Sequence, residues 1–115
     1  MKNFTFHITE EEVKQYAKIS GDNNPVHLDI EVAKQQGFSN KIAHGMLTVA
    51  KVLGIVSNEI LAPQEWVYRH EFTFTSPVYL GDQITLSIKQ LDNKIIVEGK
   101  CRKRVVIKGW LIVTR

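Results

Sequence analysis

The spacing of apolar residues changes along the chain, and the change predicts where helices give way to strands. Near the start, apolar residues alternate with polar ones at Phe4, Phe6 and Ile8, which predicts a short strand. Residues 44–61 instead carry apolar side chains at helical spacing, namely Met46, Val49, Ala50, Leu53, Val56 and Ile60. Leu47, Val52 and Ile55 cover the other sides, so this long helix is predicted to lie inside the protein.

Two shorter helices are predicted between these segments from the residues at their ends. Thr9 followed by Glu12 forms a capping box that opens a helix of about ten residues. Gly21 ends this helix in a dense run of turn-forming residues. A further short helix is expected because Asp29 can cap its start and Gly37 can stop it.

The second half of the chain is predicted to be strands, because it is rich in β-branched and aromatic residues. The expected strands are 66–76, 83–91, 94–102 and 105–114. One strand, then helices, then a run of strands predicts an α+β fold in which an antiparallel sheet is wrapped around the long central helix. A chain of 115 residues is the size of one domain, which we take to span 1–115.

Composition and charge exclude several classes of protein. The hydrophobic fraction of 43% and the charged fraction of 23% are those of a folded globular domain. The single Cys101 can form neither an intramolecular disulfide nor, by itself, a zinc site, so a cytoplasmic setting is expected. Residues 1–12 lack the apolar core of a secretion signal, and no segment is long enough to span a membrane, so no membrane association is expected.

The residues with chemical potential are concentrated in one segment, Ser20-Gly21-Asp22-Asn23-Asn24-Pro25-Val26-His27-Leu28-Asp29. A second group, His44-Gly45-Met46, follows seventeen residues after His27. Taken singly, Asp22 and Asn24 are ordinary turn residues and His27 is an ordinary buried histidine. Their combination in this order is far more specific than any one of them.

The segment resembles the hydratase-2 signature of MaoC-like enoyl-CoA hydratases, which have a hot-dog fold. Every fixed position of that signature is present here, from Ser20 to Asp29, and it precedes the His-Gly pair that opens the central helix. The resemblance implies that Asp22 and His27 hold a water, which adds to the β-carbon of a trans-2-enoyl-CoA to give an (R)-3-hydroxyacyl-CoA. A carboxylate and an imidazole suit this reaction, because one proton must be taken from water and one returned to carbon.

The resemblance assigns two further residues to the substrate. The backbone N–H of Gly45 would point at the thioester oxygen, where charge develops, and the absence of a side chain would permit close approach. Asn24 would orient the catalytic pair and line the site. The resemblance implies no metal and no cofactor, since coenzyme A is part of the substrate, and it implies a homodimer.

Some features leave alternatives open. Hot-dog acyl-CoA thioesterases also place acidic residues near the central helix, and a non-catalytic acyl-CoA-binding or partner subunit would keep the same scaffold. His44 is expected to cap the helix or to pack beside the site. The cluster 102–104 is basic, and it is either a solvated turn or a contact for coenzyme A phosphates; it lacks the pattern of a DNA-reading helix, so no nucleic-acid partner is expected.

Two positions depart from the family pattern. Lys41 stands where many members have proline, which puts the entrance of the site and the acyl-chain preference in doubt. The connection at 102–104 also lacks the Gly or Asn that a tight hairpin favours.

Overall fold

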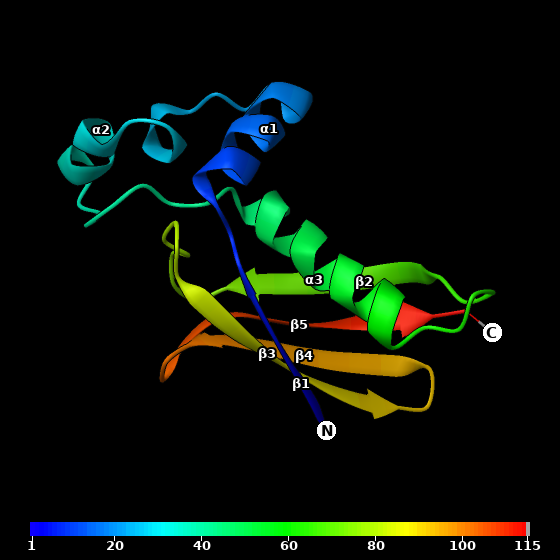
Figure 1. Ribbon diagram of the computed structural model, residues 1–115. Coiled ribbons are helices and arrows are strands. Elements are labelled where there is room, and N and C mark those ends of the chain that lie inside the picture. Colours follow the sequence, from blue (N-terminus) through cyan, green and yellow to red (C-terminus); the bar gives the residue numbers. More distant parts are fainter. Residues whose placement is uncertain (115) are drawn as a thin grey trace.

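The computed structural model describes residues 1–114 and forms one antiparallel sheet with helices on one side (Figure 1). Its strands lie in the order β1-β3-β4-β5-β2, so that β1 and β2 are the two edges. The strands are β1 (Lys2–His7), β2 (Val67–Phe74), β3 (Gln83–Leu91), β4 (Lys94–Cys101) and β5 (Arg104–Val113). The helices are α1 (Glu10–Ser20), the single 3-10 turn η1 (Pro25–His27), α2 (Ile30–Gln35) and α3 (Gly45–Glu59).

The local signals for the two short helices are confirmed by their hydrogen bonds. The Glu12 N–H donates to the Thr9 hydroxyl at 3.1 Å, and the Glu12 carboxylate accepts from the Thr9 N–H at 2.9 Å. Gly21 then ends α1 with a φ of 79°, a conformation that glycine adopts without strain. Asp29 caps α2 through the N–H of Glu31, and these two helices stand at one end of the sheet (Figure 1).

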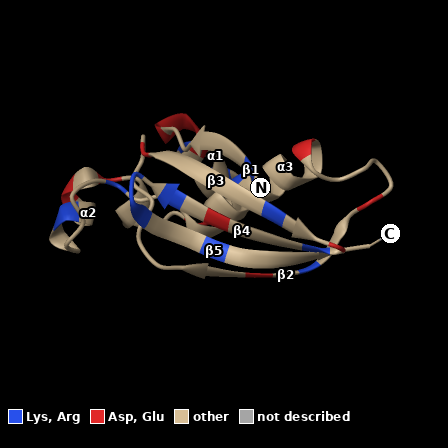
Figure 2. Ribbon diagram, turned by 90° about the horizontal axis from the view of Figure 1, so that it is seen from below, with Lys and Arg blue, Asp and Glu red and all other residues tan. Residues whose placement is uncertain are grey.

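The core lies between α3 and the inner face of the sheet. Alternate residues of the central strands point inward and are fully buried, namely Ile84 and Leu86 on β3, Ile95 and Val97 on β4, and Leu111 on β5. They meet the buried side of α3, which carries Leu47, Val49, Val52 and Val56. Figure 2 shows the sheet from below, where Lys, Arg, Asp and Glu residues lie along the strands.

The long helix packs on the sheet as predicted, but part of its surface is exposed, which corrects the prediction that it lies wholly inside the protein. Met46, in its first turn, is 58% exposed, and Ala50 is also exposed. Among residues 1–114, some apolar side chains of this helix therefore remain exposed. In the described residues no helix is long and apolar enough to cross a membrane.

Candidate active site

The loop between α1 and α2 is held by two consecutive turns that its own side chains close. The Asp22 carboxylate accepts from the Asn24 N–H at 3.2 Å, and the Asn24 side-chain oxygen accepts from the Val26 N–H at 3.1 Å. Asp and Asn close such turns well because a short side chain reaches the N–H two residues ahead. Asn24 in this way starts the turn η1, which carries His27. The spacing of Asp22 and Asn24 therefore fixes where His27 points.

His27 is 9% exposed, and its hydrogen bond fixes which ring nitrogen carries the proton. Its Nδ1 lies 2.7 Å from the backbone carbonyl oxygen of Ile42. A carbonyl oxygen only accepts, so Nδ1 is the protonated nitrogen. The other nitrogen, Nε2, consequently keeps its lone pair and can accept a proton.

The surroundings of His27 favour its neutral form. Burial lowers the pKa of His27 below its ordinary value of 6.5, and the neighbouring His44 lowers it further. The bond to Ile42 and the negative charge of Asp22 act in the opposite direction, and the net effect is a lowered pKa. At neutral pH the imidazole of His27 is therefore uncharged, and its Nε2 can accept a proton.

His44 belongs to the same cluster. The sequence alone left open whether it caps the helix or packs beside the site. Its ring stacks on that of His27 with 3.9 Å between centroids, and it also contacts the Tyr16 ring at 4.8 Å. Its Nε2 donates to the backbone carbonyl of Asp22 at 3.1 Å. It makes no side-chain capping bond at the start of α3. His44 therefore packs beside the site and ties α3 to the Asp22 loop.

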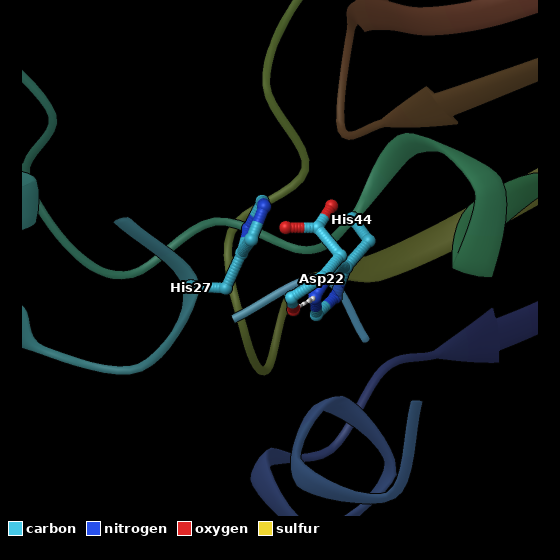
Figure 3. A group of neighbouring side chains, drawn as sticks. All are labelled: Asp22, His27 and His44. Carbon is cyan, nitrogen blue, oxygen red and sulfur yellow. Dashed lines mark hydrogen bonds between the residues drawn. The ribbon is translucent and has the colours of Figure 1, made fainter. Parts of the chain in front are cut away.

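Asp22, His27 and His44 come together in space from two separate segments (Figure 3). Figure 3 shows the Asp22 carboxylate turned toward the imidazole of His27. Within the described part of the chain, these three residues are the single group of His, Cys, Asp or Glu side chains that could hold a metal ion. Their candidate ligand atoms lie within 4.8 Å of one another. A metal would use the free Nε2 of His27, so metal binding and proton transfer by this atom exclude each other.

Gly45 directly follows His44 and is the first residue of α3. Its N–H is one of the donors that a helix leaves unpaired at its start, where the helix dipole is positive. A Cβ at this position would lie 3.2 Å from the Phe74 ring, so glycine lets that ring pack against the helix start. The two residues line a hollow of about 370 Å³ whose other walls are mainly apolar, including Phe38, Ile42, Ala43, Pro77 and Val78.

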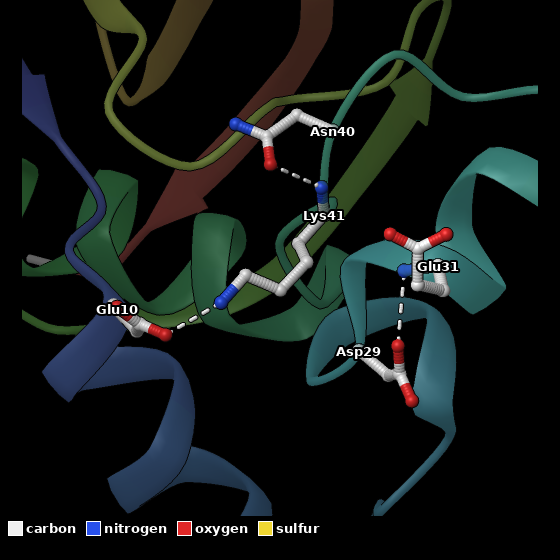
Figure 4. A network of polar contacts seen from close by, with 5 residues as sticks. All are labelled: Glu10, Asp29, Glu31, Asn40 and Lys41. Carbon is white, nitrogen blue, oxygen red and sulfur yellow. Dashed lines mark hydrogen bonds and ion pairs between the residues drawn. The ribbon is translucent and has the colours of Figure 1, made fainter.

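Lys41 holds the segment that leads into this hollow. Its ammonium group forms an ion pair with Glu10 at 2.5 Å, and its N–H donates to the Asn40 side chain at 2.8 Å (Figure 4). The pairing lowers the pKa of the exposed Glu10 carboxyl. A proline here would have no N–H to donate to Asn40. A proline would restrict the backbone of this segment. The lysine instead holds the segment in place through contacts with Asn40 and with the first turn of α1.

The structure brings the predicted site residues together in different ways. Asp22 and His27 face each other, and Gly45 adjoins them through His44. Asn24 uses its side-chain oxygen on its own loop, so it positions the turn, and its contact with substrate stays a prediction. The Ile42 carbonyl could not be found from the sequence, because a backbone atom that meets a side chain fifteen residues away leaves no mark on residue type.

A five-stranded antiparallel sheet packed on one long helix, with a loop site at the start of that helix, defines a hot-dog domain. Residues 2–109 match the model of the MaoC like domain, so the chain belongs to the MaoC-like family. This confirms the resemblance and the expected fold.

The relatives that this chain resembles include a protein named as a dehydratase and one named as a hydratase. The chain is 37% identical over 112 residues to an Arabidopsis thaliana protein named 3-hydroxyacyl-(acyl-carrier-protein) dehydratase, mitochondrial, covering 88% of this chain and only 66% of the length of that relative. It is 28% identical over 119 residues to an (R)-specific enoyl-CoA hydratase of Rhodospirillum rubrum, covering 89% and 83%. The solved structure of the R-hydratase PhaJ1 from Pseudomonas aeruginosa superposes with a TM-score of 0.83 at 28% identity, covering 97% and 77%.

Proposed function

We propose that the protein catalyses the reversible, (R)-specific hydration of trans-2-enoyl thioesters to (R)-3-hydroxyacyl thioesters. One observation carries the proposal. The carboxylate of Asp22 and the imidazole of His27 face each other, and Gly45 opens α3 directly after His44, whose ring stacks on that of His27. Named relatives support both directions, since one is an (R)-specific enoyl-CoA hydratase and another a 3-hydroxyacyl dehydratase.

Proton transfer would fall to the Asp22 and His27 pair. A water held by both side chains adds its oxygen to the β-carbon as one of its protons moves to the pair. The C=C π electrons shift toward the α-carbon and the thioester oxygen, and a proton is then delivered to the α-carbon. Water thus loses one proton, carbon gains one, and the enzyme ends as it began.

Charge on the thioester oxygen would be stabilised by the N–H of Gly45. Negative charge grows on that oxygen as the enolate forms, and a fixed donor at a helix start stabilises it without reorganising. The hollow beside Gly45 is walled by Phe38, Phe74 and Val78, whose apolar surfaces suit an acyl chain. The helix start and the hollow together would place the reacting carbons near the pair.

The test uses two substrates that differ in one double bond. Crotonyl-CoA should lose its conjugated absorbance when the protein is added, whereas butyryl-CoA should release no free thiol. Release of thiol from butyryl-CoA without hydration of crotonyl-CoA would identify a thioesterase and overturn the proposal.

The pH dependence follows from the lowered pKa of His27. Protonation of Nε2 removes the base, so kcat/KM should fall only as the pH drops through a midpoint below 6.5. Stability follows the same sign: because the folded pKa lies below the unfolded one, this group's contribution is complete above pH 6.5 and is lost as the pH falls through the folded pKa. A kcat/KM profile with a thermal melt at each pH separates the two effects, and an acid limb centred above 6.5 would contradict the assignment.

We infer that two copies pair through the edge strand β2. Within residues 1–114, strand β2 has a partner strand on one side only, so its outer backbone groups can pair with another strand. Large apolar side chains are exposed along it and just before it, with Trp66 at 60%, Tyr68 at 54% and Phe74 at 43%. A second copy laid antiparallel to β2 would cover these side chains and the open side of α3.

Light scattering on the protein as it elutes from a sizing column is expected to give a molar mass twice the chain mass of 13.2 kDa. Tyr68→Lys should weaken pairing roughly 100-fold, because a symmetric interface would bring the two new charges together. Leu91→Lys is the matched control, since Leu91 is 48% exposed on β3, away from β2. Equal masses for wild type and Tyr68→Lys would exclude this edge as the interface.

A further inference from the structure

A second hollow, of about 530 Å³, lies at the turn between β4 and β5. It is lined by Tyr79, Asp82, Cys101, Arg102, Lys103 and Arg104. Figure 2 shows basic residues gathered where β4 turns into β5. The start of α3 lies at this same end of the molecule (Figure 1).

The two hollows share one wall, the segment 76–79. Ser76 and Val78 line the apolar hollow beside Gly45, while Tyr79 lines the basic one. Arg104 braces this wall, because it donates to the Ser76 hydroxyl at 3.1 Å and pairs with Asp82 at 3.2 Å. A ligand long enough to cross this segment from the apolar hollow would reach the basic one.

Arg102 and Lys103 differ from Arg104, because the structure gives their side chains no bracing contact of this kind in the described residues. Both are exposed, and within the described residues neither side chain forms an ion pair or a hydrogen bond. Their charges are therefore free to meet a ligand, unlike that of Arg104.

The backbone of this turn is also unusual. Arg102 has a φ of 58°, a left-handed conformation that favours glycine, asparagine or aspartate. The equivalent turn between β3 and β4 places Asp92 at the same φ, which is an ordinary choice. An arginine held in this conformation at the rim of a hollow points to a use for its charge.

We propose that Arg102 and Lys103 bind the phosphate at the end of a substrate's pantetheine arm. The inference rests on the proposed function, which places a thioester beside Gly45. Two exposed cations beside a tyrosine ring suit a phosphate, which accepts charge-assisted hydrogen bonds from both. That phosphate is common to coenzyme A and to the prosthetic group of an acyl carrier protein.

The test measures binding by calorimetry with thioethers, which can be neither hydrated nor hydrolysed. The probes are S-butyl-pantetheine, S-butyl-4′-phosphopantetheine and S-butyl-coenzyme A. Lys103→Ala and Arg102→Gly should each weaken binding of the phosphorylated probes about five- to tenfold and leave the pantetheine probe unchanged. Loss confined to the coenzyme A probe would overturn the assignment by placing a nucleotide phosphate here, whereas loss with both phosphorylated probes would support the shared one.

Two controls separate this proposal from others. Lys89→Ala removes an equal charge from the far end of β3 and should leave all three affinities unchanged. Arg102→Gly relieves the backbone at a positive φ, so its melting temperature should not fall, and weaker binding cannot then be ascribed to unfolding. Unchanged affinity for every probe in both variants would overturn the subsite, even if the protein hydrates crotonyl-CoA. Absence of hydration with variant-sensitive binding would overturn the proposed function alone.

Discussion

Asp22→Asn and His27→Gln are each expected to lower kcat for hydration of crotonyl-CoA by about 100- to 10,000-fold, the range that one positioned acid or base supplies. The amide in Asp22→Asn would still offer an oxygen to the Asn24 N–H, so the loop should keep its shape. The amide in His27→Gln would keep a polar group near the Ile42 carbonyl but would remove the proton-accepting Nε2. The loss should therefore fall on kcat more than on KM.

A matched control for this pair is Asp29→Asn. It makes the same change of charge at an exposed carboxylate that caps α2, and it should leave kcat within about twofold of wild type while lowering stability slightly. Full activity in both Asp22→Asn and His27→Gln would contradict the assigned pair.

Gly45→Pro should lower kcat by about 100- to 1,000-fold relative to Gly45→Ala, the usual effect of losing one oxyanion donor. Both substitutions add a Cβ that meets the Phe74 ring, but only proline removes the N–H. The site tolerates proline because Gly45 is the first residue of α3, and because His44 before it already has the extended angles, φ −61° and ψ 137°, that proline requires.

Comparing Gly45→Pro with Gly45→Ala isolates the contribution of the Gly45 N–H to kcat. Thermal melts should show similar stability for both, since proline at the first helical position replaces a donor that has no partner within the helix. Equal kcat values for Gly45→Pro and Gly45→Ala would remove the Gly45 N–H from the mechanism, although the Asp22 and His27 pair would stand.

Much of the fold was predictable because its signals are local. The capping box at Thr9, the cap at Asp29 and the strand spacing each depend on residues close together in the chain, and all three are confirmed. The predicted bounds of β3, 83–91, agree with the structure, and the other strands differ by a few residues at their ends. A strand ends where the neighbouring strand no longer offers backbone groups for hydrogen bonding. The spacing of residue types along the sequence does not show this point.

The predictions that failed or stayed open depend on distant parts of the chain. Helix α3 carries apolar residues around most of its circumference, yet Met46 and Ala50 are exposed in the described part of the chain, because apolarity indicates burial without naming the partner. The role of His44 stayed open between capping and packing, since only the fold shows its ring stacked on His27. A homodimer and a cytoplasmic location stay predictions, and the Arabidopsis relative is named as mitochondrial.

The sequence predicted which residues gather in the candidate site, but not where the proton of His27 lies, and the roles of these residues stay predictions. The order Asp22, Asn24, His27 and Gly45 identified the segment, and the structure brings these residues to one end of α3. The tautomer of His27, which decides whether it can act as a base, depends on the Ile42 carbonyl. Chemistry that rests on a backbone oxygen can be seen only in three dimensions.

The most direct measurement is the stereochemistry of the product that the wild-type protein forms from crotonyl-CoA. Chiral separation of the hydroxyacid released after hydrolysis should give (R)-3-hydroxybutyrate alone, formed at a rate that Asp22→Asn reduces at least about 100-fold. An (S) or racemic product, or no product from folded protein, would contradict the account.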